Sequence, residues 1–281
     1  MTRGVVVVLG GRGMLGTDLV SACSRAGLET RSLHRPAFDI MDPESIAGQL
    51  IPGSVVVNCA AYTHVDDAET HREMAFSVNG SGAGIVARAC YEYDCRLIQI
   101  STNYVFSGQE IRPYREEDPT DPVNTYGASK LEGERLVAQR LENSLIVRSQ
   151  SLFGRNGRHF VSEICRKLDA GASELRVVND QICSPTNTKH LAGAILTLLQ
   201  SEHTGLVHVS ASGQCTWYDF AVEIVRQVKP GVIVHPVQSV EYPLPARRPS
   251  YAVLDTSRFQ AWTGRELPSW KEGLADYHEK I

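Results

Sequence analysis

The sequence contains no long hydrophobic run. Its first apolar stretch, "VVVVL" at 5–9, is followed directly by glycine. A membrane-spanning helix needs about 20 mostly apolar residues, and the apolar core of a signal peptide needs about 7–15. We therefore expect neither a membrane span nor a signal peptide, and we expect the protein to be cytoplasmic.

The sequence also lacks an excess of positive charge. It has 28 lysines and arginines against 32 aspartates and glutamates, which gives a formal net charge of -4, and it has no run of basic residues. Surfaces that bind nucleic acid or anionic membranes are usually strongly basic. We therefore expect neither a nucleic-acid partner nor a membrane partner.

The cysteines and histidines do not form a metal-binding pattern. The 7 cysteines include no CxxC spacing, and the 9 histidines include no HExxH spacing. An odd number of cysteines leaves one over in any full pairing, so a disulfide framework is disfavoured. We expect no metal site and interpret the cysteines as free thiols in a reducing compartment.

Short β-rich runs alternate with helical stretches through the first half of the chain. This alternation predicts a doubly wound, Rossmann-like α/β fold, in which helices cover both faces of a parallel sheet. Strands are expected at 5–9, 28–33, 54–58, 96–101 and 144–149, and helices at 14–27, 43–50, 72–94 and 125–142.

The pattern loosens after residue 150. A helix near 158–170, a strand near 175–178 and a helix at 187–201 precede a mixed tail that contains the loop "EYPLPARRPS". We expect residues 1–150 to form a dinucleotide-binding domain and 151–281 a smaller C-terminal α/β lobe. The 187–202 stretch is expected to return to the first domain.

The segment "GGRGMLG" lies between a predicted strand and a predicted helix. Gly10, Gly13 and Gly16 have the spacing GxxGxxG. Glycines at such positions permit a tight turn and a close approach of the backbone to a pyrophosphate, which the start of the helix then binds. The segment predicts a nucleotide site, and the alternative is a glycine-rich turn that only closes the strand-helix unit.

The second strand ends in "TRSLHRP", where an acid that binds the adenosine ribose of NAD would be expected. Arg31, His34 and Arg35 stand there instead, and no acid precedes Asp39. A guanidinium matches a 2′-phosphate in charge and geometry, so NADP(H) is favoured and NAD(H) remains an option. The alternative is a solvated basic loop.

Candidate catalytic residues follow later strands. Thr102 stands at the end of the fourth strand, where the ligand crevice of a doubly wound sheet is expected. Tyr126 and Lys130 are four residues apart, on one face of the predicted helix 125–142. Together they form the Ser/Thr–Tyr–Lys constellation of a ketone reductase, although a lone YxxxK also occurs in ordinary surface helices.

The chain resembles the dTDP-4-dehydrorhamnose reductase family of extended short-chain dehydrogenases/reductases. The resemblance runs nearly end to end, and its most specific segments are "STNYVFSG" and "YREEDPTDPVNTYGASKLEGE". Further segments are "GGRGMLG", "AAYTHVDDAE", "FSVN", "VVNDQICSPT", "GLVHVSASGQCTWYDFA" and "RRPSYAVLD". It implies NADPH- or NADH-dependent reduction of the 4-keto group of a dTDP-6-deoxy-L-hexulose, which gives dTDP-L-rhamnose.

The resemblance also implies site residues. The catalytic residues would be Thr102, Tyr126 and Lys130. The cofactor-binding residues would be Tyr126, Lys130, Gly10, Gly13, Met14, Leu15, Gly16, Arg35, Asp39, Ile40, Ala60, Ala61 and Tyr62. The substrate-binding residues would be Asn103, Tyr104, Ser151 and Arg248, with the nucleotide sugar extending into the lobe 151–281. A homodimer is compatible with the family.

The implied chemistry assigns one role to each catalytic residue. Tyr126 would give its proton to the oxygen of the reduced keto group, and Thr102 would hold that oxygen. The Lys130 cation would lower the pKa of the Tyr126 phenol from its usual value of about 10. Arg247 or Arg248 would meet the diphosphate of the nucleotide sugar.

Four residues depart from the usual family pattern. Asn103 replaces an aspartate, Ser151 replaces the tryptophan of rhamnose-forming members, and His159 and Cys183 alter two further motifs. Two alternatives therefore stay open. One is a reductase for another NDP-4-keto-6-deoxysugar, and the other is a non-catalytic regulatory subunit similar to the β subunit of methionine adenosyltransferase.

Overall fold

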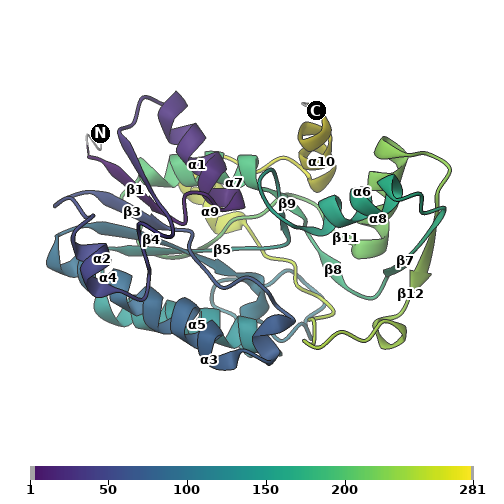
Figure 1. Cartoon of the computed structure of the whole chain (residues 1–281), viewed down its shortest axis with the longest axis horizontal. Coiled ribbons are helices and arrows are strands. Elements are labelled where there is room, and N and C mark those ends of the chain that lie inside the picture. The colour runs from purple at the N-terminus through teal and green to yellow at the C-terminus, as the bar shows by residue number, and fades with distance from the viewer. Residues whose placement is uncertain (1–3, 280–281) are drawn as a thin grey trace.

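A six-stranded parallel sheet forms the centre of the molecule (Figure 1). The computed structural model describes residues 4–279. The strands lie in the order β10-β5-β4-β3-β1-β2, so the order reverses between β1 and β3. Their bounds are β1 (Val6–Leu9), β2 (Thr30–Leu33), β3 (Val55–Asn58), β4 (Arg96–Thr102), β5 (Ser144–Ser149) and β10 (Gly205–His208).

Helices cover both faces of this sheet (Figure 1). Val6 and Val8 of β1 face one helical layer, while Val7 and Leu9 face the other. The inner strands are therefore buried on both faces, which explains their continuous apolar runs. The predicted doubly wound α/β fold is confirmed. The first layer contains α1 (Met14–Arg25), α7 (Thr188–Leu199) and α9 (Ser257–Thr263), and the second contains α2 (Pro43–Ala47), α4 (Gly82–Glu92) and α5 (Thr125–Arg140).

A smaller lobe, at the right of Figure 1, has its own hydrophobic core. Phe153, Ile164, Phe220 and Trp270 belong to that core. The lobe contains α6 (Phe160–Asp169), α8 (Trp217–Val228) and two small sheets, in which β7 (Glu174–Val178) pairs with β12 (Ile233–Val237) and β8 (Ile182–Cys183) with β11 (Cys215–Thr216). The remaining elements beside it are β6 (Leu152–Phe153), β9 (Thr186–Asn187), η4 (Ser239–Glu241) and α10 (Trp270–His278).

The chain returns to the large sheet after it has entered the smaller lobe. Helix α7 packs on α1, and the Thr188 hydroxyl donates a hydrogen bond to Asp18 at 2.5 Å. Residues 205–208, which the sequence analysis assigned to the smaller lobe, form β10 and pair with β5. Helix α9 also packs on the large sheet through Phe259. The functional division into 1–150 and 151–281 remains a prediction.

A π-helical turn interrupts the helical stretch that the sequence predicts as 72–94. The stretch divides into α3 (Arg72–Phe76), the π-turn η2 (Ser77–Ser81) and α4. Such turns often occur at functional sites. The turn places the carbonyl of Asn79 against Gly133 of α5, where an added Cβ would lie 2.1 Å from the carbonyl oxygen. Only glycine therefore allows α5 to pack this closely on η2.

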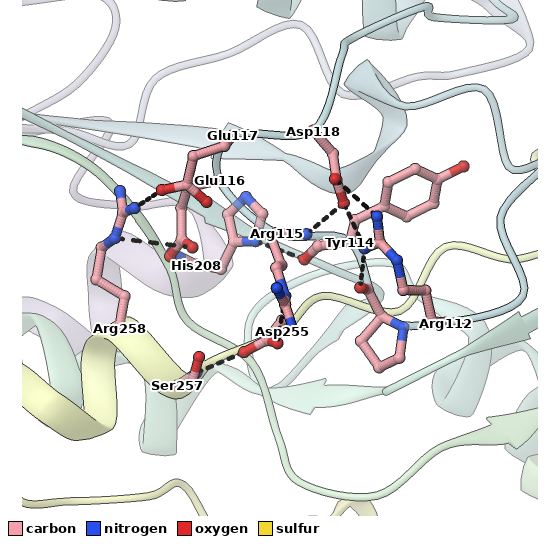
Figure 2. A network of polar contacts seen from close by, with 11 residues as sticks. Arg112, Tyr114, Arg115, Glu116, Glu117, Asp118, His208, Asp255, Ser257 and Arg258 are labelled. Carbon is pink, nitrogen blue, oxygen red and sulfur yellow. Dashed lines mark hydrogen bonds and ion pairs between the residues drawn. The ribbon is translucent and has the colours of Figure 1, made fainter.

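Polar contacts fix the loop between β4 and α5 (Figure 2). The Glu116 Oε1 accepts a hydrogen bond from the His208 backbone N–H at 2.8 Å, and the Glu116 Oε2 lies 3.8 Å from the Arg258 Nε. Burial, together with the nearby Arg148 cation, lowers the pKa of His208 to about 3, so this imidazole is neutral. The loop is thereby tied to β10 and to α9. The same network includes Arg112–Asp118, Arg115–Asp255 and Arg258–Glu117 ion pairs.

The sequence analysis expected no membrane span, no metal site and no disulfide framework, and the structure describes residues on which each expectation can be examined. Between residues 4 and 279, no helix has the length and apolar character needed to cross a membrane. The same residues contain no group of three or more His, Cys, Asp or Glu side chains arranged to hold a metal ion. All seven cysteines are free thiols.

Replacing Gly133 by alanine is expected to lower the free energy of unfolding by about 1–3 kcal/mol, because the new methyl group would clash with the Asn79 carbonyl. Gly193→Ala is the matched control, since Gly193 is exposed on α7 and its added Cβ would meet nothing within 4 Å. That substitution should stabilise the helix by about 0.5–1 kcal/mol. Urea unfolding measures both, and equal midpoints would contradict the close packing of α5.

Candidate active site

A cavity of about 930 Å³ lies at the carboxyl ends of β1, β3, β4 and β5 and extends into the smaller lobe. The crevice beside the reversal of strand order is where doubly wound sheets bind ligands. Most of the predicted site residues line it. They are Gly10, Gly13, Met14, Leu15, Gly16, Arg35, Ile40, Ala60, Ala61, Tyr62, Thr102, Asn103, Tyr104, Tyr126, Lys130 and Ser151.

The glycine loop and the start of α1 form one wall of the cavity. Gly10 has a positive φ of 76°, and its added Cβ would lie 2.8 Å from the Ala60 nitrogen. Gly13 is the N-cap of α1, no side chain caps this end, and the first turn contains no acid. The N–H groups of this turn are therefore available to an anion, and the loop fits a pyrophosphate.

The end of β2 contributes basic groups to the cavity. His34 and Arg35 line it, together with Ile40. Arg35 forms an ion pair of 3.0 Å with Asp39, whose carboxylate also accepts a hydrogen bond from the Met41 N–H. Asp39 is not among the residues that line the cavity, and its expected place along the cofactor remains a prediction.

Arg31 and Arg248 also lie outside the cavity lining. Arg31 is exposed on β2. Arg248 is 14% exposed, and its Nη2 donates to an Asp66 carboxylate oxygen at 2.8 Å. It reaches the cavity wall indirectly, through a hydrogen bond with Tyr104. An arginine already paired in this way is less available to a diphosphate than the sequence analysis assumed.

Thr102, Tyr126 and Lys130 come together on one wall. Thr102 ends β4 and caps the turn η3 (Asn103–Val105) by accepting a hydrogen bond from the Tyr104 N–H. Asn124 caps α5 by accepting from the Gly127 N–H at 2.8 Å, which sets Tyr126 and Lys130 in the first turns of the helix. The Tyr126 phenol is hydrogen-bonded with Thr102.

Burial controls the acidity of Tyr126. Removal from water raises the pKa of its phenol to about 12, and the hydrogen bond from Thr102 opposes this only in part. The expectation that the Lys130 cation lowers the pKa of Tyr126 is therefore not met in this structure. The Lys130 Nζ instead donates to the Ile100 carbonyl at 2.6 Å. Tyr126 is thus fully protonated near neutral pH.

Lys130 is also buried, and its exposed fraction is 5%. Burial lowers the pKa of its ammonium to about 8, and the negative charge of Glu134 opposes the shift. Most Lys130 side chains therefore carry a charge at pH 7. The neighbouring thiol of Cys59 is protonated, because burial raises its pKa to about 12.

Asn79 connects the cavity wall with α5, and the sequence analysis did not single it out. Its amide donates to the Tyr62 carbonyl at 3.0 Å and to the Ser129 hydroxyl at 2.9 Å, and its Oδ1 accepts from the Tyr62 N–H. The segment "FSVN" was noted for its resemblance only, and nothing in it predicts a π-turn. These bonds hold the 60–62 segment against the helix of Tyr126 and Lys130.

The smaller lobe adds an aromatic wall that was also missed. Phe160 and Trp217 line the cavity with ring centroids 4.7 Å apart, and Phe220 lines it beside them. Both side chains stand at the first position of a helix, α6 and α8 respectively. Arg158 lines the same region and pairs with Glu163 at 2.6 Å.

Comparison with known proteins decides the family. A family model described as the RmlD substrate binding domain matches residues 4–281. The spore coat polysaccharide biosynthesis protein SpsK of Bacillus subtilis is 38% identical over 275 residues, which cover 97% of this chain and 96% of that protein. The dTDP-4-dehydrorhamnose reductase of Sinorhizobium fredii is 35% identical over 284 residues, with 95% and 94% covered. The chain belongs to the dTDP-4-dehydrorhamnose reductase family.

A solved structure of the dTDP-4-dehydrorhamnose reductase family agrees with this assignment. The enzyme of that name from Bacillus anthracis, crystallised in complex with NADP, superposes with a TM-score of 0.95 at 33% identity. The superposition covers 99% of both chains. The smaller lobe and the large sheet therefore both follow the architecture of the family.

The structure gives physical reasons for two departures from the reductase family pattern. The Asn103 amide donates to the Ala252 carbonyl at 2.9 Å, while its Oδ1 accepts from Thr102 at 3.3 Å. An ionised aspartate could not make the first bond. His159 accepts from the Ser162 N–H as the cap of α6, and burial lowers its pKa, which keeps the ring neutral for that role.

Ser151 and Cys183 change the cavity at the junction with the smaller lobe. Ser151 lines the cavity with a positive φ of 48°. Its side chain is hydrogen-bonded with the thiol of Cys183, which is buried behind it and does not line the cavity. The small side chain of Ser151 thus forms part of the cavity lining at a point where the sequence analysis expected a tryptophan in rhamnose-forming reductases.

Proposed function

We propose that the protein is an NADPH-dependent reductase of the 4-keto group of a dTDP-4-keto-6-deoxy-L-hexose, converting dTDP-4-dehydrorhamnose to dTDP-L-rhamnose. The observation that carries this proposal is the meeting of Thr102, Tyr126 and Lys130 in one cavity with the glycine loop. The names of the relatives and the NADP bound to the Bacillus anthracis enzyme support it.

The residues divide the proposed chemistry among them. NADPH, when bound, supplies the hydride that reaches C4 of the sugar. The Tyr126 Oη gives its proton to the carbonyl oxygen, and the raised pKa of about 12 keeps that proton in place until negative charge develops on the oxygen. The Thr102 hydroxyl donates a hydrogen bond to the same oxygen. Lys130 compensates the charge left on the phenolate.

The two lobes would bind the two molecules separately. We propose that the domain 1–150, with 187–202, binds the cofactor, and that the lobe 151–281 binds the nucleotide sugar. Phe160 and Trp217 offer an apolar surface there, and Arg158 is a cation that lines the cavity beside them. The predicted cytoplasmic location and homodimer remain predictions, and analytical ultracentrifugation would test the latter.

A reductase of another NDP-4-keto-6-deoxysugar is the second candidate. The specific observation in its favour is the space at Ser151, and SpsK is named for spore coat polysaccharide rather than for rhamnose. Mixing the protein with NADPH and dTDP-4-dehydrorhamnose distinguishes the candidates. Oxidation of NADPH with formation of dTDP-L-rhamnose is expected, whereas turnover of a different sugar nucleotide alone would favour the second.

The same assay addresses the alternative of a non-catalytic regulatory subunit. Such a protein would bind NADPH and consume none with any 4-keto-6-deoxysugar nucleotide. The presence of all three candidate catalytic side chains, Thr102, Tyr126 and Lys130, in the cavity favours catalysis, because a subunit that only binds has no need for a proton donor.

Tyr126→Phe is expected to lower kcat by about 10²–10⁴-fold, because the ring keeps its packing while the proton donor is lost. NADPH affinity should stay within about twofold, since the phenol contributes to the chemical step. Steady-state kinetics and fluorescence titration measure the two quantities. Turnover comparable to that of the wild type would remove Tyr126 from the role of acid.

NADPH is expected to bind more tightly than NADH, because Arg35 lines the cavity and can pair with the 2′-phosphate. Its pairing with Asp39 competes with this interaction, so the preference should be modest, about tenfold. Arg35→Ala should abolish the preference, while the control Arg31→Ala on the exposed side of β2 should not. If Arg35→Ala bound NADPH and NADH with the same affinities as the wild type, the basic loop would be shown to be solvated surface only.

Ser151→Trp is expected to raise kcat/KM for dTDP-4-dehydrorhamnose by lowering KM, because an aromatic wall adds apolar contact with the hexose. The backbone there has a φ of 48°, which is strained for a bulky side chain, so strain should offset part of this gain. Activity on a bulkier native sugar should fall. An effect on no sugar nucleotide would show that position 151 does not contact the substrate.

A further inference from the structure

A buried ion pair lies one helical turn beyond Lys130. Glu134 is 5% exposed, and both its carboxylate oxygens accept hydrogen bonds from Arg148 of β5, at 2.9 Å from Nε and 2.6 Å from Nη2. Ser101 of β4 donates to the same carboxylate. Ser101 and Arg148 are neighbours across the strands β4 and β5. The carboxylate is thus held by the sheet, although it belongs to the helix.

The groups around Lys130 come from three elements. Tyr126 and Glu134 flank it on α5, the Cys59 thiol faces it from the end of β3, and the Ile100 carbonyl of β4 accepts from its Nζ. Of the described residues, Glu134 is the only one whose carboxylate acts on Lys130.

The side chains around Glu134 reach from α5 to β10, the edge strand of the large sheet. Arg148 reaches Glu134 from β5 and also acts on His208 of β10, which is neutral. The guanidinium of Arg148 lies over the Phe106 ring at 5.0 Å. Glu134 is therefore the single negative charge between two cations, Lys130 and Arg148.

Glu134 acts on Lys130 without a direct bond. The residues described form no ion pair between the two side chains, since both oxygens of Glu134 are taken by Arg148 and Ser101. The Lys130 side chain consequently stays on the cavity wall. The negative charge of Glu134 still favours the charged form of Lys130 across the short distance of one helical turn.

We propose that Glu134 is a positioning residue of the reductase: its charge keeps Lys130 an ammonium in the buried site, while Arg148 and Ser101 hold Glu134 away from it. This role rests on the proposed function, because it assigns to Lys130 a charge that the reduction uses. The role differs from a merely structural ion pair, since it predicts that removing the carboxylate charge changes the protonation of Lys130.

Glu134→Gln tests the proposal, because the amide keeps the size of the side chain and an oxygen that accepts from Arg148 and Ser101. The alkaline fall of kcat/KM, expected near pH 8 in the wild type from Lys130, should move down by about one unit. Glu134→Asp, which keeps the charge, should restore most of the profile. Glu132→Gln is the matched control, because Glu132 lies on the same helix beside Gly80, away from Lys130.

Removal of one partner of a buried pair can prevent folding, so a second variant is needed. Glu134→Gln combined with Arg148→Met removes both buried charges, and loss of the Arg148 cation opposes loss of the Glu134 anion, so its downward shift should be smaller than that of Glu134→Gln. In folded Glu134→Gln protein, a profile that coincides with the wild type would overturn the proposal, even if kcat fell.

An independent readout separates this proposal from the proposed function. The Cε signal of Lys130 in ¹³C-labelled protein, assigned with Lys130→Arg, reports its titration in the free protein without cofactor or sugar. A downward shift in Glu134→Gln supports the proposal even if no sugar nucleotide is reduced by the wild type. Reduction by the wild type together with an unmoved signal would overturn the role of Glu134 and leave the proposed function standing.

Discussion

The close packing of helix α5 on the sheet and on the turn η2 is the constraint on which the site depends. Gly133 lets the Asn79 carbonyl approach the helix to a distance that any side chain would block. Asn79 then joins the helix to the segment of Tyr62, and the Glu134–Arg148 pair joins it to β5. These contacts hold α5 at Ser129 and at Glu134, so that Tyr126 and Lys130 face the carboxyl end of β4.

Burial gives this packing an electrostatic consequence. Taking a charge out of water costs several kcal/mol, so buried ions persist only where partners compensate them. The site contains two buried cations, Lys130 and Arg148, with Glu134 between them, and it holds its phenol and thiol in the neutral form. A protonated phenol and a charged lysine can therefore stand side by side at neutral pH.

The smaller lobe and the large sheet contribute different parts of the cavity. Ser151, its link to Cys183 and the aromatic pair Phe160–Trp217 lie where the cavity extends into the smaller lobe. A change there alters the shape of the cavity without moving Thr102, Tyr126 or Lys130.

The sequence by itself determined the doubly wound sheet, the glycine loop and the set Thr102, Tyr126 and Lys130. Buried strands, helix starts and tight turns are specified by neighbouring residues, and a spacing of four places two side chains on one helical face. Only the tertiary structure decided which polar groups meet across long distances in the chain. In the folded protein, Arg248 pairs with Asp66 and Asp39 pairs with Arg35. Strand β10 lies beside β5. The pKa of Tyr126 is set by burial rather than by the Lys130 cation. Ion pairs and pKa values depend on the groups and the solvent that surround a side chain in space, and a local pattern does not specify these surroundings.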